Sequence, residues 1–337
     1  MHKSSCMKAI IPVAGAGTKL RPFTYTQPKP LIPVAGKPII AFILDHMIEA
    51  GIKDFIFVIG YLGDKIKEYL DENYNHINRE YIFQGERMGL GHAIYTCKHL
   101  IPPGSEVLIQ LGDTILDVDL NVLMHSKHHT LAVRKVNDPR AFGVVELHED
   151  GTIKRLIEKP QIPKSNLAIV GLYFIKDFNI LAHSLKHNID NDLRTRGEFH
   201  LTDGLMHMIE CGQRFDVMEV KNWFDCGKKE QLLLTNSILL DRDLDAHLES
   251  SISNHVIIIP PVKIGKDSKI TNSIIGPHVT IGDHAQIEGV IIKDAIIGNY
   301  TILDNVTLHN SIIGNDAVIK GRSQSYNIGD NTEIDMA

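Results

Sequence analysis

A glycine-containing turn beside two cations is the first stretch whose residue types could do chemistry. The segment PVAGAGTKLRP contains Gly15, Gly17, Lys19 and Arg21 and directly follows the apolar run at residues 7–11. Backbone N–H groups in such a turn bind phosphate oxygens, and nearby cations add charge-assisted hydrogen bonds. The segment matches neither the dinucleotide-binding pattern G-x-G-x-x-G nor the Walker A pattern. It therefore predicts an anion-binding turn of another kind, with a structural turn and solvated lysines as the alternative.

Two aspartates far apart in the chain carry carboxylates that could bind a cation. Asp113 follows the apolar run VLIQL and a glycine, and Asp225 lies in the segment WFDCG. Carboxylate oxygens suit Mg²⁺, which typically takes one or two carboxylates together with substrate phosphates. A cap or a turn is the alternative role for either residue alone. The position after a buried strand favours a functional role for Asp113, whereas the residues around Asp225 leave its role open.

The histidines do not predict a zinc site. His125, His128 and His129 lie close together, and His183 and His187 are four apart on an expected helix. The chain contains 18 histidines, so such spacings arise by chance, and a zinc site requires a more specific pattern.

The elements that must position these residues alternate between strands and helices from residue 7 to residue 240. Apolar runs predict strands near residues 7–13, 55–59 and 107–111, and helical spacing predicts helices near residues 38–50, 64–73 and 89–100. This alternation is typical of an α/β domain with a mostly parallel sheet. Ligands of such sheets bind beyond the carboxyl ends of the strands. We therefore expect Gly15, Gly17 and Asp113 along one edge of the sheet.

The pattern changes beyond residue 248, where apolar residues recur every six positions. The repeat places one residue per short face toward the inside of a parallel β-helix. An antiparallel sandwich, the alternative, would alternate with a period of two. We therefore predict a catalytic domain at 7–240, a linker at 241–251 and a β-helix at 252–337. The residues expected to face inward are Ile264, Ile270, Ile275, Ile281, Ile287, Ile291, Ile297, Leu303, Ile313 and Ile319.

Composition limits the partners and the compartment. The net charge of −6 predicts no general attraction to nucleic acid or to anionic membranes. No apolar run reaches the length of a membrane span. The four cysteines form neither a CxxC pair nor a disulfide-dense pattern, which indicates reduced thiols and a cytoplasmic protein. The β-helix and the sheet surfaces favour a homo-oligomer.

The segments GAGTKLRP and PKPLIPVAGKP together resemble the signature of the sugar-1-phosphate nucleotidyltransferases. Lys19 stands where arginine is usual in that signature, so the charge is kept and the planar guanidinium is lost. The resemblance continues, in the expected order, through QGERMGLGHA, LGDTI, FGVVE, EKP, VGLYF and WFDCG. It implies a Rossmann-like nucleotidyltransferase domain followed by a short left-handed β-helix.

The resemblance also implies roles for individual residues. Mg²⁺ is expected on Asp113 and Asp225. The cations expected at the reacting and leaving phosphates are Lys19, Arg21 and Lys29. The residues expected to bind the nucleotide are Ala14, Gly15, Gly17, Thr18, Gln84, Gly89 and His92. The residues expected to bind the sugar phosphate are Gly143, Glu158, Lys159 and Gly171.

The expected reaction joins a hexose-1-phosphate to a nucleoside triphosphate and releases pyrophosphate. Family frequency favours glucose-1-phosphate, and the segment GLGHA is similar to members that use UTP or dTTP. The attacking phosphate oxygen is already an anion, so His92 is not needed as a general base. The alternatives are a mannose-1-phosphate guanylyltransferase and a catalytically silent regulatory subunit. Retention of Asp113, Asp225, Lys29 and Lys159 argues against the silent subunit.

Acetyl transfer by the β-helix is a further alternative. The few coils argue against it, and His278, His284 and His309 are more simply explained as exposed histidines of an assembly or capping module.

Overall fold

A computed structural model describes residues 7–243, 251–252, 255–322 and 333 of the 337-residue chain. The chain divides into two compact units. The first comprises residues 1–33 and 37–231, and the second comprises residues 34–36 and 232–337. The domain limits expected from the sequence stay a prediction, and most of the expected linker lies outside the described residues.

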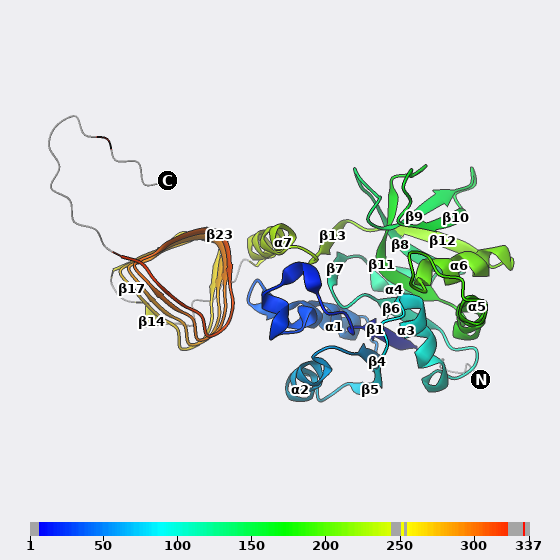
Figure 1. Ribbon diagram of the computed structural model, residues 1–337, viewed down its shortest axis with the longest axis horizontal. Helices are drawn as coiled ribbons and strands as arrows, with labels where there is room; N and C mark the ends of the chain where they lie inside the picture. Colours follow the sequence, from blue (N-terminus) through cyan, green and yellow to red (C-terminus); the bar gives the residue numbers. More distant parts are fainter. Residues whose placement is uncertain (1–6, 244–250, 253–254, 323–332, 334–337) are drawn as a thin grey trace. The chain divides into compact units, whose positions relative to one another are not determined.

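The first unit contains a nine-stranded sheet (Figure 1). Its main path runs β10-β9-β11-β6-β1-β4-β5, and β8 joins β12 to β11. The strands of the path are β10 Ile153–Glu158, β9 Gly143–Leu147, β11 Leu167–Ile175, β6 Val107–Gln110, β1 Lys8–Pro12, β4 Asp54–Ile59 and β5 Asn78–Phe83. The other two are β8 His129–Lys135 and β12 Phe215–Glu219. The block β6-β1-β4-β5 is parallel, which confirms the predicted α/β arrangement, and β11 pairs antiparallel with β6.

Three strands of the parallel block, β6, β1 and β4, are apolar on both faces, whereas the edge strand β5 is polar at its start and only partly buried. Ile10, Ile56 and Ile109 have no exposed surface, as expected for strands covered on two sides. The helices α3 Leu90–Thr96, α5 Phe178–Asp190 and α6 Leu201–Glu210 pack into the same core. The remaining helices of this unit are α1 Ile39–Glu49, α2 Gly63–Asn73 and α4 Leu120–Met124. The helices expected near residues 38–50, 64–73 and 89–100 are confirmed, the last ending in a 3₁₀ turn, η4 Cys97–Leu100.

Short elements after the strands bring distant segments together. The 3₁₀ turns η1 Thr18–Leu20, η2 Phe23–Tyr25 and η3 Lys29–Leu31 follow β1. A small antiparallel sheet joins β7 Thr114–Asp117 to β13 Asn222–Asp225, with Asp225 opposite Thr114. A hairpin joins β2 Pro33–Val34 to β3 Lys37–Pro38. Helix α7, Lys229–Arg242, begins in the first unit and continues into the second.

The second unit contains a three-sided coil of short parallel strands (Figure 1). The first side stacks β14 Ser251–Ile252, β17 Lys269–Thr271, β20 Gln286–Glu288, β22 Ile302–Asp304 and β24 Val318–Lys320. The other two sides are formed by β15 Val256–Ile258, β16 Val262–Ile264, β18 Ser273–Ile275, β19 Val279–Ile281, β21 Ile291–Ile297 and β23 Thr307–Ile313. The predicted parallel β-helix is therefore confirmed.

The inward register differs from the prediction at one residue. Ile291 is 48% exposed, whereas its neighbour Ile292 is fully buried. Successive coils take 17 and then 16 residues, because Ile264 pairs with Ile281, which pairs with Ile297. A strict six-residue spacing would need 18 residues for three sides, so some corners are one residue shorter. The inward position after Ile287 therefore falls on Ile292.

No helix in the described part of the chain is both long enough and apolar enough to cross a membrane.

Candidate active site

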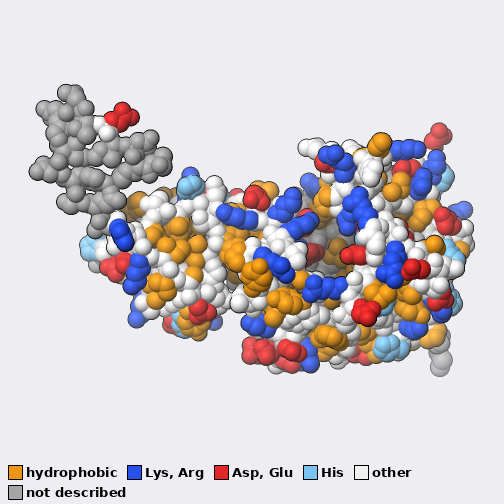
Figure 2. Space-filling model, in the orientation of Figure 1, with side chains coloured by type: hydrophobic (Ala, Val, Ile, Leu, Met, Phe, Trp, Pro, Cys, Tyr) orange, Lys and Arg blue, Asp and Glu red, His pale blue; other side chains and the backbone are white. Residues whose placement is uncertain are grey.

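A cavity of about 680 Å³ lies in the first unit, where the strands of the parallel block end. All of the predicted site residues except Arg21 and His92 line it. They are Ala14, Gly15, Gly17, Thr18, Lys19, Lys29, Gln84, Gly89, Asp113, Gly143, Glu158, Lys159, Gly171 and Asp225. Figure 2 shows a hollow in this unit with lysine and arginine side chains around it. Segments spread over more than 200 residues of sequence therefore converge on one space.

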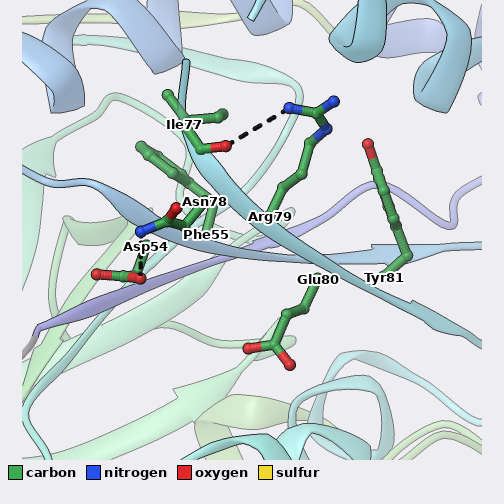
Figure 3. A pocket seen from close by; sticks show the side chains of 7 residues that line it. All are labelled: Asp54, Phe55, Ile77, Asn78, Arg79, Glu80 and Tyr81. Carbon is green, nitrogen blue, oxygen red and sulfur yellow. Dashed lines mark hydrogen bonds between the residues drawn. The ribbon is translucent and has the colours of Figure 1, made fainter. Parts of the chain in front are cut away.

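A second hollow of about 460 Å³ lies against the edge strand β5 (Figure 3). Its polar groups bond one another: Asn78 Nδ2 donates to Asp54 Oδ1 at 3.1 Å, and Arg79 Nη1 donates to the Ile77 carbonyl at 3.5 Å. None of the predicted site residues lines it. We therefore place the candidate site in the larger cavity.

The glycine turn presents bare backbone to the larger cavity. Gly17 has φ +59°, and a side chain there would lie 2.8 Å from the Thr24 methyl group, so only glycine fits without strain. Thr24 Oγ1 donates to the Gly17 carbonyl at 2.8 Å and holds the turn. A Cβ at Gly15 would meet nothing within 4 Å. The turn is therefore rigid at Gly17 and open at Gly15, as expected if an anion is to approach the backbone.

The two aspartates lie beside each other at the ends of β6 and β13. Asp225 pairs with Thr114 across the small sheet, and the Cys226 N–H donates to the Asp113 carbonyl at 3.2 Å. Lys29 Nζ donates to Asp113 Oδ2. Burial raises the pKa of Asp225, the charge of Asp113 raises it further, and nearby lysine charges oppose the rise. Two like charges so close together favour a bound cation.

The donor set fits a hard divalent cation held in part by the substrate. Within the residues that the structure describes, no group of three or more His, Cys, Asp or Glu side chains is arranged to hold a metal. The carboxylates of Asp113 and Asp225 are therefore the candidate ligands at this place. Mg²⁺ is commonly bound by one or two carboxylates, with water and phosphate oxygens completing its shell.

The sugar-side pair Glu158 and Lys159 is held in a fixed geometry. Thr202 Oγ1 donates to Glu158 Oε2 at 2.8 Å, and Lys159 Nζ lies 3.2 Å from Glu158 Oε1. His200 Nδ1 lies 3.5 Å from the same Oε1. Lys159 has φ +43°, a left-handed conformation that is costly for a non-glycine residue. A carboxylate and an ammonium are therefore preset side by side in the cavity.

The loop that carries Gly89, one of the predicted nucleotide-binding residues, is joined by backbone hydrogen bonds to the segment at Phe199. The Phe199 N–H donates to the Met88 carbonyl at 2.8 Å, and the Gly91 N–H donates to the Phe199 carbonyl at 2.7 Å. Gly89 has φ +103°, and a Cβ there would lie 2.6 Å from the Phe199 carbonyl oxygen. Gly89 is therefore required for this close approach of two loops.

Arg21 and His92 do not line the cavity. The exposed Arg21 guanidinium lies 5.0 Å from the centre of the Tyr25 ring. His92 is half-buried, burial lowers its pKa, and its Nδ1 has no hydrogen-bond partner among the described residues. Their roles stay predictions.

The cavity also contains residues that the sequence reasoning left unassigned. They are Arg87, Glu198, His200, Thr202, Lys228 and Gln231 among others. Thr202 lies in no motif that the sequence analysis used. Its hydrogen bond to Glu158 is what identifies it as part of the site. Trp223 also lines the cavity and packs edge-on against Phe142, with ring centres 4.7 Å apart.

Comparisons with known proteins agree with this geometry. A family model described as nucleotidyl transferase matches residues 8–242. The glucose-1-phosphate thymidylyltransferase of Streptomyces antibioticus is 29% identical over 316 residues, covering 86% of this chain and 87% of that protein. The bifunctional protein GlmU of Methanocaldococcus jannaschii is 35% identical over 253 residues, covering 75% of this chain and 59% of that longer protein. A solved structure of UDP-glucose pyrophosphorylase with UDP-glucose has a TM-score of 0.60 at 24% identity, covering 70% of this chain and 99% of that one, which supports the fold alone.

Proposed function

This chain belongs to the nucleotidyl transferase family, and we propose that it joins a hexose-1-phosphate to a pyrimidine nucleoside triphosphate and releases pyrophosphate. The observation that carries the proposal is the single cavity lined by the glycine turn, the two aspartates and the Glu158–Lys159 pair. An anion-binding turn, a cation-binding carboxylate pair and a hydroxyl- and phosphate-binding pair are the parts that this reaction needs.

In the proposed reaction an oxygen of the sugar phosphate attacks the α-phosphorus of the triphosphate in line. The new P–O bond forms as the bond between the α-phosphorus and the pyrophosphate oxygen breaks, and the electron pair leaves with pyrophosphate. The attacking oxygen is already an anion, so no base removes a proton. Positioning and charge neutralisation then supply most of the rate enhancement. Lys19 is assigned to the leaving phosphates and Lys29 to the reacting ones. The part expected of Arg21 at the leaving phosphates stays a prediction, since Arg21 does not line the cavity.

Asp113 and Asp225 are the residues that would hold Mg²⁺. When bound, the ion would neutralise phosphate charge and polarise the α-phosphate. The chain's own contribution is to hold the two carboxylates beside each other through the β7–β13 pairing. Lys29, which contacts Asp113, brings an ammonium group to the same place.

Glu158 and Lys159 are assigned to the sugar phosphate. The Glu158 carboxylate, held by Thr202, would accept hydrogen bonds from sugar hydroxyls. The Lys159 ammonium would bind the phosphate as a compact charge. Gly143 leaves room for them, since a Cβ there would lie 3.1 Å from Thr202 Oγ1 and 3.3 Å from Glu158 Oε2.

The choice of base and sugar is the finer part of the proposal. Glucose-1-phosphate with dTTP or UTP is supported by the thymidylyltransferase relative and by the segment GLGHA. The test is a pyrophosphate-release screen of dTTP, UTP, CTP, GTP and ATP against glucose-1-phosphate, mannose-1-phosphate and N-acetylglucosamine-1-phosphate with Mg²⁺. We expect the highest kcat/KM for glucose-1-phosphate with a pyrimidine nucleotide.

Two outcomes would overturn that choice. Preference for GTP with mannose-1-phosphate would replace the proposal by the guanylyltransferase alternative. Binding of nucleotide without release of pyrophosphate from any pair would favour the regulatory subunit. A homo-oligomer also stays a prediction, which light scattering over a range of protein concentrations would test.

A further inference from the structure

Lys228 is a cation of the cavity to which neither the motifs nor the proposed mechanism assigns a role. It lines the cavity three residues after Asp225, and its side chain is exposed. It forms no ion pair with any carboxylate in the described part of the chain. Its neighbour Lys229 has the same charge but does not line the cavity. The two adjacent lysines therefore have the same charge but differ in access to the site.

The backbone before Lys228 folds closely onto the Asp225 carboxylate. A Cβ at Gly227 would lie 2.9 Å from Asp225 Oδ1, so the backbone at this residue lies close to the carboxylate. Lys228 thus directly follows a residue in contact with a proposed metal ligand. Its backbone position therefore keeps Lys228 near the Asp225 side of the cavity.

Lys228 also stands where a cation is unfavourable for the fold. Helix α7 begins at Lys229, and the amino end of a helix carries a partial positive charge that disfavours nearby cations. Sequences usually place Asp, Ser, Thr or Asn just before such a helix. Only Glu230 is acidic in the first turn. Lys228 and Lys229 both break this local rule, and of the two only Lys228 lines the cavity, where a function can offset the cost.

We propose that Lys228 is a catalytic residue whose ammonium contacts the α-phosphate during phosphoryl transfer. The inference rests on the proposed function. Of the other cations of the cavity, Lys19 is assigned to the leaving phosphates, Lys159 to the sugar phosphate and Lys29 to the reacting phosphates, and Arg87 has no assigned role. Lys228 would act on the α-phosphate together with Lys29. Lys228 adds positive charge on the Asp225 side, where negative charge collects as the α-phosphate is attacked. It makes no covalent bond and moves no proton.

The test compares Lys228→Ala with Lys229→Ala, which remove the same charge one residue apart. We expect Lys228→Ala to lower kcat about 30-fold or more, with a smaller change in KM, because the contact strengthens in the transition state. Lys229→Ala should stay within about twofold of the wild type, as is usual for a substitution away from the site. Lys228→Arg should restore most of the activity, since it restores the charge.

Thermal melting separates a catalytic from a structural role. Loss of a cation at the start of α7 should leave the Tm of Lys228→Ala unchanged or raise it, while activity falls. Equal kinetics for Lys228→Ala, Lys229→Ala and the wild type would overturn the inference and leave the proposed function standing. A lowered Tm without rescue by arginine would also overturn it. A wild-type chain that releases no pyrophosphate from any substrate pair would instead count against the proposed function.

Discussion

The β-helix and the sheet unit both contain left-handed residues, but they use different residue types for them. In the β-helix such residues recur at the corners, and most are Asn, Asp or His, for example Asp267, Asn272 and Asp316. These types tolerate a positive φ at low cost. In the sheet unit, Lys159 has this conformation at the cavity, where its type does not favour it. The corners therefore serve architecture, whereas Lys159 is a strained residue at the cavity; Leu62 and Arg196 share the conformation outside it.

Buried polar groups show the same contrast. In the β-helix, the buried hydroxyls of Ser268 and Ser273 donate to backbone carbonyls at 2.8 and 2.7 Å. In the sheet unit, the buried indole N–H of Trp223, which lines the cavity, has no partner among the described residues. Buried polar groups are normally paired, so an unpaired one at a cavity indicates a group available to a ligand. These buried hydroxyls of the β-helix are paired within the protein, whereas the buried Trp223 N–H at the cavity is available to a ligand.

The largest expected effect is on the aspartate pair. Asp113→Asn should reduce product formation by about a thousandfold or more, because the site loses the charge that binds the metal. Circular dichroism should show an unchanged fold, since the amide keeps the shape of the carboxylate. Turnover near the wild-type rate would contradict the metal assignment.

A glycine substitution in the β-helix tests whether close packing in this unit contributes strongly to the stability of the chain. Gly276 has φ +112°, and a Cβ there would lie 1.9 Å from the Ile259 carbonyl oxygen. Gly276→Ala should lower the free energy of unfolding by about 3 kcal/mol through strain and overpacking. Gly212→Ala is the control, because Gly212 also has a positive φ but open space around it. Equal melting shifts for the two variants would show that crowding at Gly276 is relieved.

Lys159 tests the sugar side of the site. Lys159→Ala should raise KM for the sugar phosphate about 10- to 100-fold, the loss expected for one charge-assisted hydrogen bond. Lys164→Ala, an exposed lysine outside the cavity, should leave KM unchanged. Initial-rate kinetics check both, and an unchanged KM in Lys159→Ala would remove this residue from phosphate binding.

Substitution of Asp225 tests whether this buried carboxylate of the site lowers the stability of the fold. Because its pKa is raised in the folded state, the folded chain binds the proton more tightly than the unfolded chain. Stability should therefore fall as pH rises through the window between the ordinary and the raised pKa. Asp225→Asn should remove this dependence and raise Tm at neutral pH in buffer with EDTA, while activity is lost. Thermal melts from pH 4 to 8 measure it, and a lower Tm for the variant at neutral pH would contradict the argument.

The smallest effect is expected at a β-helix corner. Asp316 has φ +57° and is exposed. Asp316→Gly should change stability by no more than about 0.5 kcal/mol, whereas Asp316→Val should lose about 1–2 kcal/mol because a branched side chain fits this backbone poorly. Urea unfolding of the pair measures the difference. Equal stabilities would show that the corner relaxes to another conformation.

Local pattern was enough to predict most elements. The strand after residue 7, the helix that follows Pro38 and the turn at Gly15 and Gly17 each depend on neighbours in sequence. The β-helix followed from its repeat for the same reason. Ile291 was predicted wrongly because corner length depends on how successive coils stack, which no single repeat specifies.

The sequence by itself determined the kinds of groups at the site: a bare glycine backbone, several lysines and isolated carboxylates. Only the tertiary structure decided which of them meet. Asp225 lies beside Asp113 because β13 pairs with β7, although the two aspartates are more than a hundred residues apart. Thr202 holds Glu158, and Lys228 rather than Lys229 lines the cavity. Side-chain type is a property of each residue, whereas proximity arises from long-range packing that a local pattern does not encode.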